Sequence, residues 1–319
     1  MYSFVLVLVL SSLLCPAMSM PTVSFFASFI WGSVIILSGY YNGWKKSLLI
    51  AVINLLIIYQ LGGWGSVMAA SALIIIPAMI MSALVDYKRD YYEIRSWGVW
   101  GAVACVLLYL GTSYYQMGPG GAENLQKAMQ DYIGQVLEMS RNSEMVRIYA
   151  QRGISWQYIE DSFQSFGRNL LLHLPALYCL QGVAVAFLAL WGASWFAQRK
   201  GLPVLSRKDY RDEIMPWQLT WVVILALSLW LWGRDDLSAV YYAGSNLLLF
   251  MAPITMYYGL AGFIYRAALM SPRARKWAII FLVVMSLVFF VSVVIFLALL
   301  GLFDALLDYR KIRTRKGEP

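Results

Sequence analysis

Long apolar runs separated by short polar stretches dominate the chain. A membrane-spanning helix needs about 20 apolar residues, with a range of about 17–25. Runs of this kind occupy nine stretches, 2–18, 21–40, 47–63, 66–85, 97–116, 169–196, 217–233, 245–266 and 277–303. We interpret the first run as a span and not as a cleaved signal segment, because Met1-Tyr2-Ser3 places no basic residue before it. The pattern predicts an all-α fold, a polytopic transmembrane helical bundle of about eight to nine spans.

One extended polar segment, residues 117–168, interrupts this pattern. It begins at the hinge Gly118-Pro119-Gly120 and then repeats apolar residues on one helix face, at Leu125, Met129, Tyr132, Ile133, Val136 and Leu137. The segment is either an amphipathic helical hairpin on the outer membrane surface or a lid over an outward-facing cavity. We predict a five-span membrane region (1–116), an extracytoplasmic amphipathic hairpin (117–168), a C-terminal membrane region (169–303) and a basic tail (304–319).

Composition excludes a water-soluble domain. Of the 319 residues, 61% are hydrophobic and 13% are charged, and the mean hydropathy is +0.64, whereas soluble domains are about 25% charged. The formal net charge of +8 does not indicate a nucleic-acid partner, because the basic residues lie between the apolar runs. Cys15, Cys105 and Cys179 fall inside apolar runs without paired spacing, so we expect buried thiols and neither disulfides nor metal ligands.

The lysines and arginines predict the orientation of the spans. If the N-terminus is cytoplasmic, the loops after the second, fourth, sixth and eighth runs are cytoplasmic too. These four loops contain most of the basic residues: Lys45 and Lys46; Lys88, Arg89 and Arg95; Arg199, Lys200, Arg207, Lys208 and Arg211; and Arg266, Arg273, Arg275 and Lys276. Nine crossings, however, would leave the basic tail outside, with Arg310, Lys311, Arg313, Arg315 and Lys316. We expect a cytoplasmic tail, so either run 277–303 does not cross simply or another span is misassigned.

The span interiors offer little polar chemistry. An ionisable side chain inside a span would indicate function because it is costly in hydrocarbon, and essentially none is present. This absence disfavours a proton-coupled transporter. Asn54, Gln60 and Gln181 lie at depth, and hydrogen bonding between helices is the expected role of each. The single histidine, His173, has no histidine partner for a metal site, and we expect a structural or interfacial role.

Two acidic pairs lie outside the spans. Asp235-Asp236 could act as an acid and a base, but a short external connection favours a solvated turn. Asp304 and Asp308 share one helix face, and we expect local pairing with Arg310 or Lys311. The sequence contains no P-loop, dinucleotide-binding glycine pattern, HExxH or GxSxG motif. We therefore predict no enzyme activity, assign no catalytic, cofactor-binding or metal-binding residue, and leave the substrate-binding residues unknown.

Glycine and proline mark places where helices pack closely or bend. Small residues allow close approach of helices in lipid, and prolines inside spans are candidate kinks. The residues concerned are Gly62, Gly63, Gly65, Gly98, Gly101, Gly259 and Gly262 for packing, and Pro77 and Pro253 for kinks.

Short motifs in the C-terminal third carry a family resemblance. They are Lys208-Asp209-Tyr210-Arg211, Met215-Pro216-Trp217-Gln218-Leu219-Thr220-Trp221, Asn246-Leu247-Leu248-Leu249, Tyr258-Gly259-Leu260-Ala261, Leu300-Gly301-Leu302-Phe303-Asp304 and Asp308-Tyr309-Arg310-Lys311. With these motifs the chain resembles the YybS-like family of bacterial inner-membrane proteins of unknown function. The first five spans, with Lys88-Arg89 closing the fourth, are similar to the N-terminal part of that family.

The YybS-like family is distantly similar to the substrate-binding S-components of energy-coupling-factor vitamin transporters. The resemblance implies a helical bundle with a small-molecule cavity, and coupling subunits or other membrane proteins as partners. One departure concerns docking, because the Ala-x-x-x-Ala pair common in the first span of S-components is absent from 2–18. Ala189 and Ala193 have this spacing, but in the sixth span.

The sequence favours an S-component-like protein of the bacterial inner membrane, multi-pass with a cytoplasmic N-terminus, that binds or transports a small molecule. The alternative is a membrane scaffold or assembly factor, whose outer hairpin or cytoplasmic loop 197–216 recruits an envelope or cytoplasmic partner. The lipid bilayer is the one certain environment, and the small molecule is unidentified.

Overall fold

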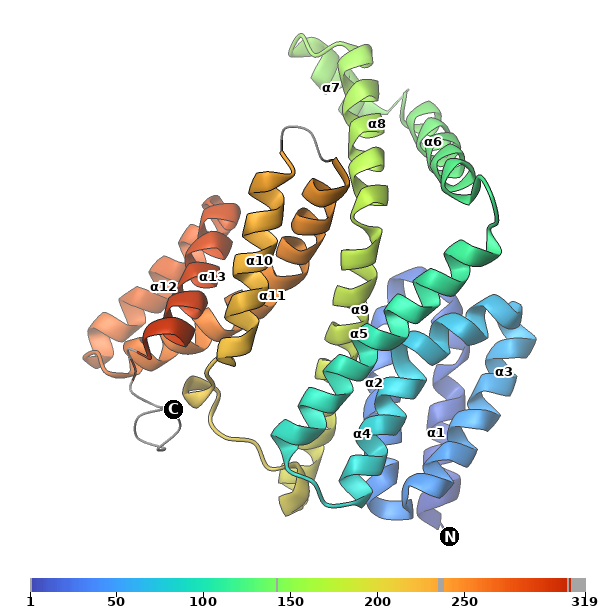
Figure 1. Ribbon diagram of the computed structural model, residues 1–319, viewed down its shortest axis with the longest axis vertical. Coiled ribbons are helices and arrows are strands. Elements are labelled where there is room, and N and C mark those ends of the chain that lie inside the picture. Colours follow the sequence, from blue (N-terminus) through green and yellow to red (C-terminus); the bar gives the residue numbers. More distant parts are fainter. Residues whose placement is uncertain (1, 142, 235–237, 309, 311–319) are drawn as a thin grey trace. The chain divides into compact units, whose positions relative to one another are not determined.

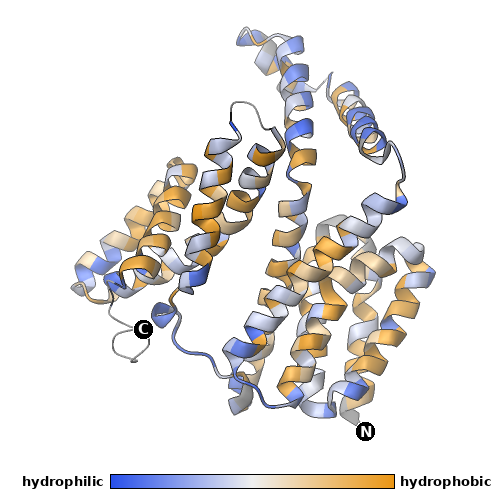
Figure 2. Ribbon diagram, viewed as in Figure 1, coloured by the Kyte–Doolittle hydropathy of each residue, from blue (hydrophilic) through white to orange (hydrophobic). Residues whose placement is uncertain are grey.

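The chain is helical in the computed structural model, which describes residues 2–141, 143–234, 238–308 and 310, with no strand among them (Figure 1). The helices divide into two units, Met1–Leu205 and Ser206–Pro319. In the described residues six helices are long and apolar enough to cross a membrane, and the apolar segments Phe4–Met18 and Trp217–Trp232 are shorter. Figure 2 shows hydrophobic residues along most of these helices. The predicted all-α polytopic bundle is confirmed.

The first unit is built from apolar helices that correspond to the first six predicted spans. Their bounds are α1 (Tyr2–Leu14), α2 (Pro21–Asn42), α3 (Trp44–Ala70), α4 (Ile76–Asp86), α5 (Tyr91–Gln116) and α9 (Leu174–Arg199). The long α3 is broken at Gly63, where φ is 69° and ψ is −168°, a conformation that glycine adopts without a steric cost. The chain turns there, so the third and fourth predicted spans are separate helices.

A face of small residues on α9 fills the centre of the first unit. Ala189 and Ala193 are almost fully buried, and a Cβ placed on Gly32 of α2 would approach Ala189 Cβ to 2.8 Å. The Ser33 hydroxyl of α2 also donates to the Ala189 carbonyl oxygen at 2.8 Å. The Ala-x-x-x-Ala spacing of the sixth span therefore packs helices within this unit.

The polar segment forms three helices, α6 (Gly121–Ser140), α7 (Glu144–Gln151) and α8 (Trp156–Leu172). Ile133 and Leu137 of the predicted apolar stripe are buried, and Ile133 lies directly against Gly167 of α8. The stripe therefore joins α6 to α8. The sixth predicted span, 169–196, is not one helix, because its first residues end α8 and the helix is interrupted at His173 before α9 begins.

The second unit contains α10 (Trp217–Trp232), α11 (Ser238–Ala268), α12 (Pro272–Val288) and α13 (Phe290–Leu307). Run 277–303 is not a single span, which is the first of the two alternatives raised by the basic tail. Phe289 has φ of −126° and ψ of 53°, which ends α12 and starts α13. Hydropathy could not reveal this break, because apolar residues continue through it without a glycine or proline.

Helices α11 and α13 cross where Gly259 and Gly301 meet, and from this crossing both helices lead to the same end of the unit. A Cβ on Gly259 would clash with the Leu297 carbonyl oxygen and lie 3.0 Å from the Gly301 nitrogen. A Cβ on Gly301 would clash with the Thr255 carbonyl oxygen and lie 2.8 Å from the Gly259 nitrogen. Further along both helices, the Arg310 guanidinium lies 5.7 Å from the centroid of the Tyr265 ring. Because both helices lead to the same end, α12 must return between them. Arg310 therefore lies at the end of the unit where α11 finishes.

Candidate functional site

The first candidate site is a group of buried polar atoms inside the first unit. Asn54 of α3 is 0% exposed, and its Oδ1 accepts a hydrogen bond from Ser12 Oγ of α1 at 2.9 Å. The Cys15 thiol lies 3.8 Å from the Asn54 carbonyl oxygen. The predicted role of Asn54 in bonding between helices is thus confirmed. Gln60 and Gln181, by contrast, are exposed on α3 and α9.

Among the described residues of this unit, two N–H donors are buried without an acceptor. They are the Asn54 side-chain amide Nδ2 and the indole Nε1 of Trp31 on α2, a residue that is also 0% exposed. Asn54 is about 15 Å from the start of α3, and Trp31 is about 16 Å from the end of α2, at a rise of about 1.5 Å per residue. Because α2 and α3 are joined at Gly43, both donors lie at a similar depth, near the middle of a hydrocarbon core about 30 Å thick.

A backbone irregularity lies beside Trp31. Ser71–Ile75 form a turn of π-helix immediately before Pro77, which stands in the first turn of α4. A Cβ on Gly32, the neighbour of Trp31, would lie 3.9 Å from Ile74 Cγ2 of this turn. Single π-helical turns occur frequently at functional sites. The predicted irregularity at Pro77 is therefore present, and it borders one of the two unsatisfied donors.

This arrangement suits recognition of a hydrogen-bond acceptor. Each buried donor without a partner costs about 1–3 kcal/mol, and a carbonyl or ring nitrogen would satisfy it. No Asp, Glu, Lys or Arg lies within the apolar interiors of these helices. The site therefore has no group to neutralise a charged ligand.

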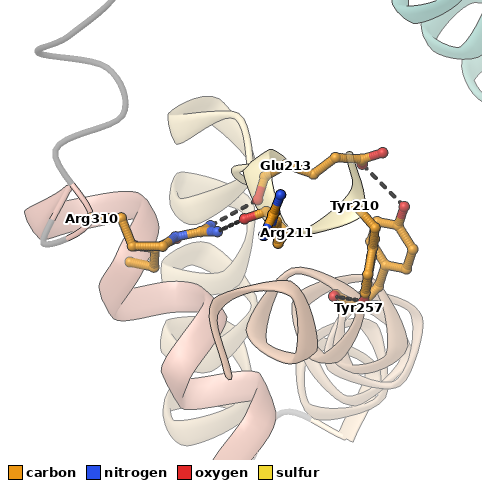
Figure 3. Close-up of polar contacts among 6 residues, drawn as sticks. Tyr210, Arg211, Glu213, Tyr257 and Arg310 are labelled. Atoms are coloured by element: carbon orange, nitrogen blue, oxygen red, sulfur yellow. Dashed lines mark hydrogen bonds and ion pairs between the residues drawn. The ribbon is translucent and has the colours of Figure 1, made fainter. Parts of the chain in front are cut away.

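The second candidate site is a buried ion pair at the end of the second unit (Figure 3). Asp304 of α13 is 1% exposed and Arg310 is 2% exposed. Arg310 Nε donates to Asp304 Oδ2 at 2.7 Å, and Nη2 bonds to the same oxygen. Pairing of Asp304 with Arg310 was one of the two expected pairings and is confirmed, while Lys311 lies outside the described residues.

Arg310 also holds the segment that precedes α10. Its Nη1 donates to the Arg211 carbonyl oxygen and its Nη2 to that of Glu213, both at 2.7 Å. These acceptors are 99 and 97 residues away in sequence. Arg310 therefore fastens the end of α13 to the segment before α10. We call Asp304, Arg310 and these two carbonyl groups the Arg310 lock.

Two tyrosines extend the Arg310 lock. The Tyr257 hydroxyl of α11 donates to Glu213 Oε2 at 3.1 Å, and the Tyr210 hydroxyl donates to the Tyr257 carbonyl oxygen at 2.5 Å. Burial, followed by the negative charge of Glu213, raises the pKa of Tyr210 above its usual value. The Tyr210 hydroxyl consequently stays protonated and keeps its role as a donor.

The other predicted residues fall in less distinctive places. His173 occupies the junction of α8 and α9, where Nδ1 lies 2.7 Å from the Asn169 carbonyl oxygen. Asp308 ends α13 in a left-handed conformation with φ of 40°. Asp235 and Asp236 lie outside the described residues. Within the described residues, no three His, Cys, Asp or Glu side chains gather as metal ligands would.

Sequence reasoning missed Trp31 and the carbonyl partners of Arg310. Trp31 is one of many aromatic residues in apolar runs, and nothing local marks its indole as unsatisfied. The sequence predicts Arg310 as a residue of the basic tail and as a partner of Asp304, but it does not predict the bonds of Arg310 to the Arg211 and Glu213 carbonyl groups. The spacing of six residues between Asp304 and Arg310, across a helix end, was the available signal for their pairing.

The helical architecture and apolar surface define a polytopic integral membrane protein. Residues 6–305 match the model of a family described as predicted membrane protein, DUF2232, and the chain belongs to this family. No curated protein matches the chain, and no solved structure matches it.

Proposed function

We propose that the chain is a non-catalytic membrane protein that binds a small neutral molecule within the helices of Met1–Leu205. The observation that carries this proposal is the presence of two buried, unsatisfied donors on Asn54 and Trp31, of which Trp31 is the neighbour of a residue that lies against the π-helical turn. A ligand with hydrogen-bond acceptors and an apolar body would satisfy both donors. It would also match a bundle whose span interiors contain no charged side chain.

Entry of this ligand requires the helices to part, because Asn54 and Trp31 are fully enclosed. The segment between Gly63 and Pro77 is suited to this movement. It has a glycine break at one end and the π-helical turn at the other, and both interrupt the regular hydrogen bonding of a helix. The described conformation is then the closed one, with the ligand site occluded.

The proposal agrees with the YybS-like and S-component-like resemblance, which implies a small-molecule cavity in a helical bundle. Docking to a coupling subunit would need a surface other than the Ala189 and Ala193 pair, since both residues are buried within the unit. We propose that any coupling subunit or other membrane partner contacts the lipid-facing surface of the bundle instead.

We further propose a bacterial inner-membrane location with both ends of the chain in the cytoplasm. The break at Phe289 replaces one predicted crossing with two helices, and the number of crossings becomes even. Arg310 lies beside Arg211 and Glu213, so the start of the tail shares a side with the basic loop before α10. This arrangement removes the conflict between the basic tail and the positive-inside rule.

Binding is tested with the full chain in lipid nanodiscs, using a fractionated pool of neutral bacterial metabolites as the probe. A ligand at 100 times its Kd stabilises a protein by about 2.7 kcal/mol. One fraction should raise the melting temperature of the wild type and of the Gln60→Leu control, which alters an exposed polar residue of the same helix. The same fraction should leave Asn54→Leu unchanged. Stabilisation of all three proteins alike, or of none, contradicts the proposal.

A second candidate function is a scaffold that recruits an envelope protein. It is favoured by the exposed aromatic residues of α8, where Tyr158, Phe163 and Phe166 are 67%, 45% and 64% exposed. Deletion of residues 122–165 separates the two functions. Loss of a co-purifying envelope protein with retained metabolite binding supports the scaffold, whereas loss of metabolite binding assigns the segment to the ligand site as a lid.

A further inference from the structure

Helix α12 is unusual in the second unit because none of its residues is buried. Its apolar side chains are half-buried or exposed, and Phe281 and Leu287 are 65% and 81% exposed. The helix is about 25 Å long at about 1.5 Å per residue, close to the thickness of the hydrocarbon core. Lipid acyl chains can therefore lie along most of its length.

One end of α12 carries a concentration of positive charge. Arg266, Arg273, Arg275 and Lys276 lie within eleven residues, and no Asp or Glu occurs between residues 237 and 303. Arg275 is used within the protein, since Nε and Nη2 donate to the carbonyl oxygens of Ala267 and Ala268 at 3.2 and 2.9 Å. These two bonds supply donors to carbonyl groups in the last turn of α11, which have no partner within the helix.

Arg273 and Lys276 remain for an external partner. Both side chains are exposed, and no ion pair joins either one to another described residue. Trp277 follows directly and is 65% exposed, as expected of an aromatic residue at the level of the lipid headgroups. The order of these groups along α12 matches the order of the parts of a phospholipid. The cationic side chains correspond to the headgroup, the tryptophan to the glycerol region and the apolar helix to the acyl chains.

We propose that α12 is a binding site for an anionic phospholipid. The phosphate contacts Arg273 and Lys276, and the acyl chains lie along the apolar surface around Phe281, Val284 and Leu287. The charge complementarity identifies the occupant, because a zwitterionic lipid would leave the local positive charge uncompensated. The bound lipid would also shield a helix that has few contacts of its own within the second unit.

The test is native mass spectrometry of the full chain released from nanodiscs that contain dioleoylphosphatidylglycerol and dioleoylphosphatidylcholine in equal amounts. The wild type should retain the phosphatidylglycerol. Because a basic residue near an anionic membrane surface contributes about 1 kcal/mol, or about fivefold in affinity, Arg273→Gln/Lys276→Gln should reduce retention about 25-fold. The charge-preserving Arg273→Lys/Lys276→Arg variant should retain the lipid.

The matched control is Lys127→Gln/Arg147→Gln, which removes the same charges from exposed positions on α6 and α7. This control should retain phosphatidylglycerol as the wild type does. Equal retention of the two lipids by the wild type, or equal losses in the two charge-removing variants, overturns the proposal. Competition by soluble glycerol 3-phosphate would assign the site to a free anion and overturns the assignment to a lipid.

Discussion

The Arg310 lock allows a quantitative prediction, because its two charged members are almost completely buried. Removing Arg310 leaves the Asp304 carboxylate in an apolar environment without its cation, at a cost of about 3–5 kcal/mol. It also removes the donors to the Arg211 and Glu213 carbonyl groups. Arg310→Ala should therefore destabilise the second unit strongly, and Asp304→Ala should do so by a similar mechanism with the opposite charge left buried.

A double-mutant cycle isolates the interaction between the two side chains. The variant with both substitutions buries no isolated charge, so its loss of stability should be smaller than the sum of the two single losses. We expect a coupling free energy of about 2–3 kcal/mol. The measurement is the free energy of unfolding of the full chain in detergent micelles, followed for wild type, both single variants and the double variant.

The pair formed by Arg211 and Asp209 provides a matched control in the same segment. Its Nε to Oδ2 distance is 2.9 Å, but its side chains are 50% and 51% exposed. Exposed ion pairs contribute at most about 1 kcal/mol, so this second cycle should give a coupling below that value. Equal coupling energies in the two cycles would refute the reasoning, because burial would then have no influence on the Arg310 lock.

Three further outcomes are expected. Gly259→Ala should destabilise the protein by about 1–3 kcal/mol or more, because the added Cβ would clash with the Leu297 carbonyl oxygen. The control Gly111→Ala adds a Cβ in open space and should be neutral or stabilising. Thermal unfolding of the two variants and the wild type measures the difference. The raised pKa of Tyr210 means that the folded state holds this proton more tightly, so stability should fall as pH rises above about 10, and Tyr210→Phe should reduce that slope in pH-dependent unfolding. A fluorescent protein fused after the tail should fold and fluoresce in the cytoplasm, and a periplasmic location of the fusion would contradict the even number of crossings.

The apolar runs predicted most of the membrane helices, because a helix that crosses the hydrocarbon core needs about 20 apolar residues. They failed where a helix ends without polar residues, as at Phe289, and where a polar helix continues toward an apolar one, as at His173. The break at His173 does have a local cause, because Pro175 stands in the first turn of α9 and has no N–H to continue α8. Of the glycines predicted to allow close packing, Gly259 does so at the crossing of α11 and α13, whereas Gly63 has no neighbour within 4 Å and instead breaks a helix.

The candidate sites could be predicted only in part. The hydrogen bond of Asn54 to another helix could be predicted, because a side-chain amide without a partner is unfavourable in lipid. The pairing of Asp304 with Arg310 could be predicted from their proximity in sequence. The carbonyl partners of Arg310 lie nearly a hundred residues away, and the unsatisfied indole of Trp31 is a property of its surroundings. These features depend on tertiary packing, which local patterns do not record.

The central claim is that the Met1–Leu205 helices hold a small molecule against Asn54 and Trp31. Native mass spectrometry of the full chain, extracted from its own membrane without added ligand, tests it most directly. We predict a stoichiometric mass increment of a small neutral molecule on the wild type and on Gln60→Leu, and its loss from Asn54→Leu. An increment that persists in Asn54→Leu, or a wild type that carries none, would contradict the account.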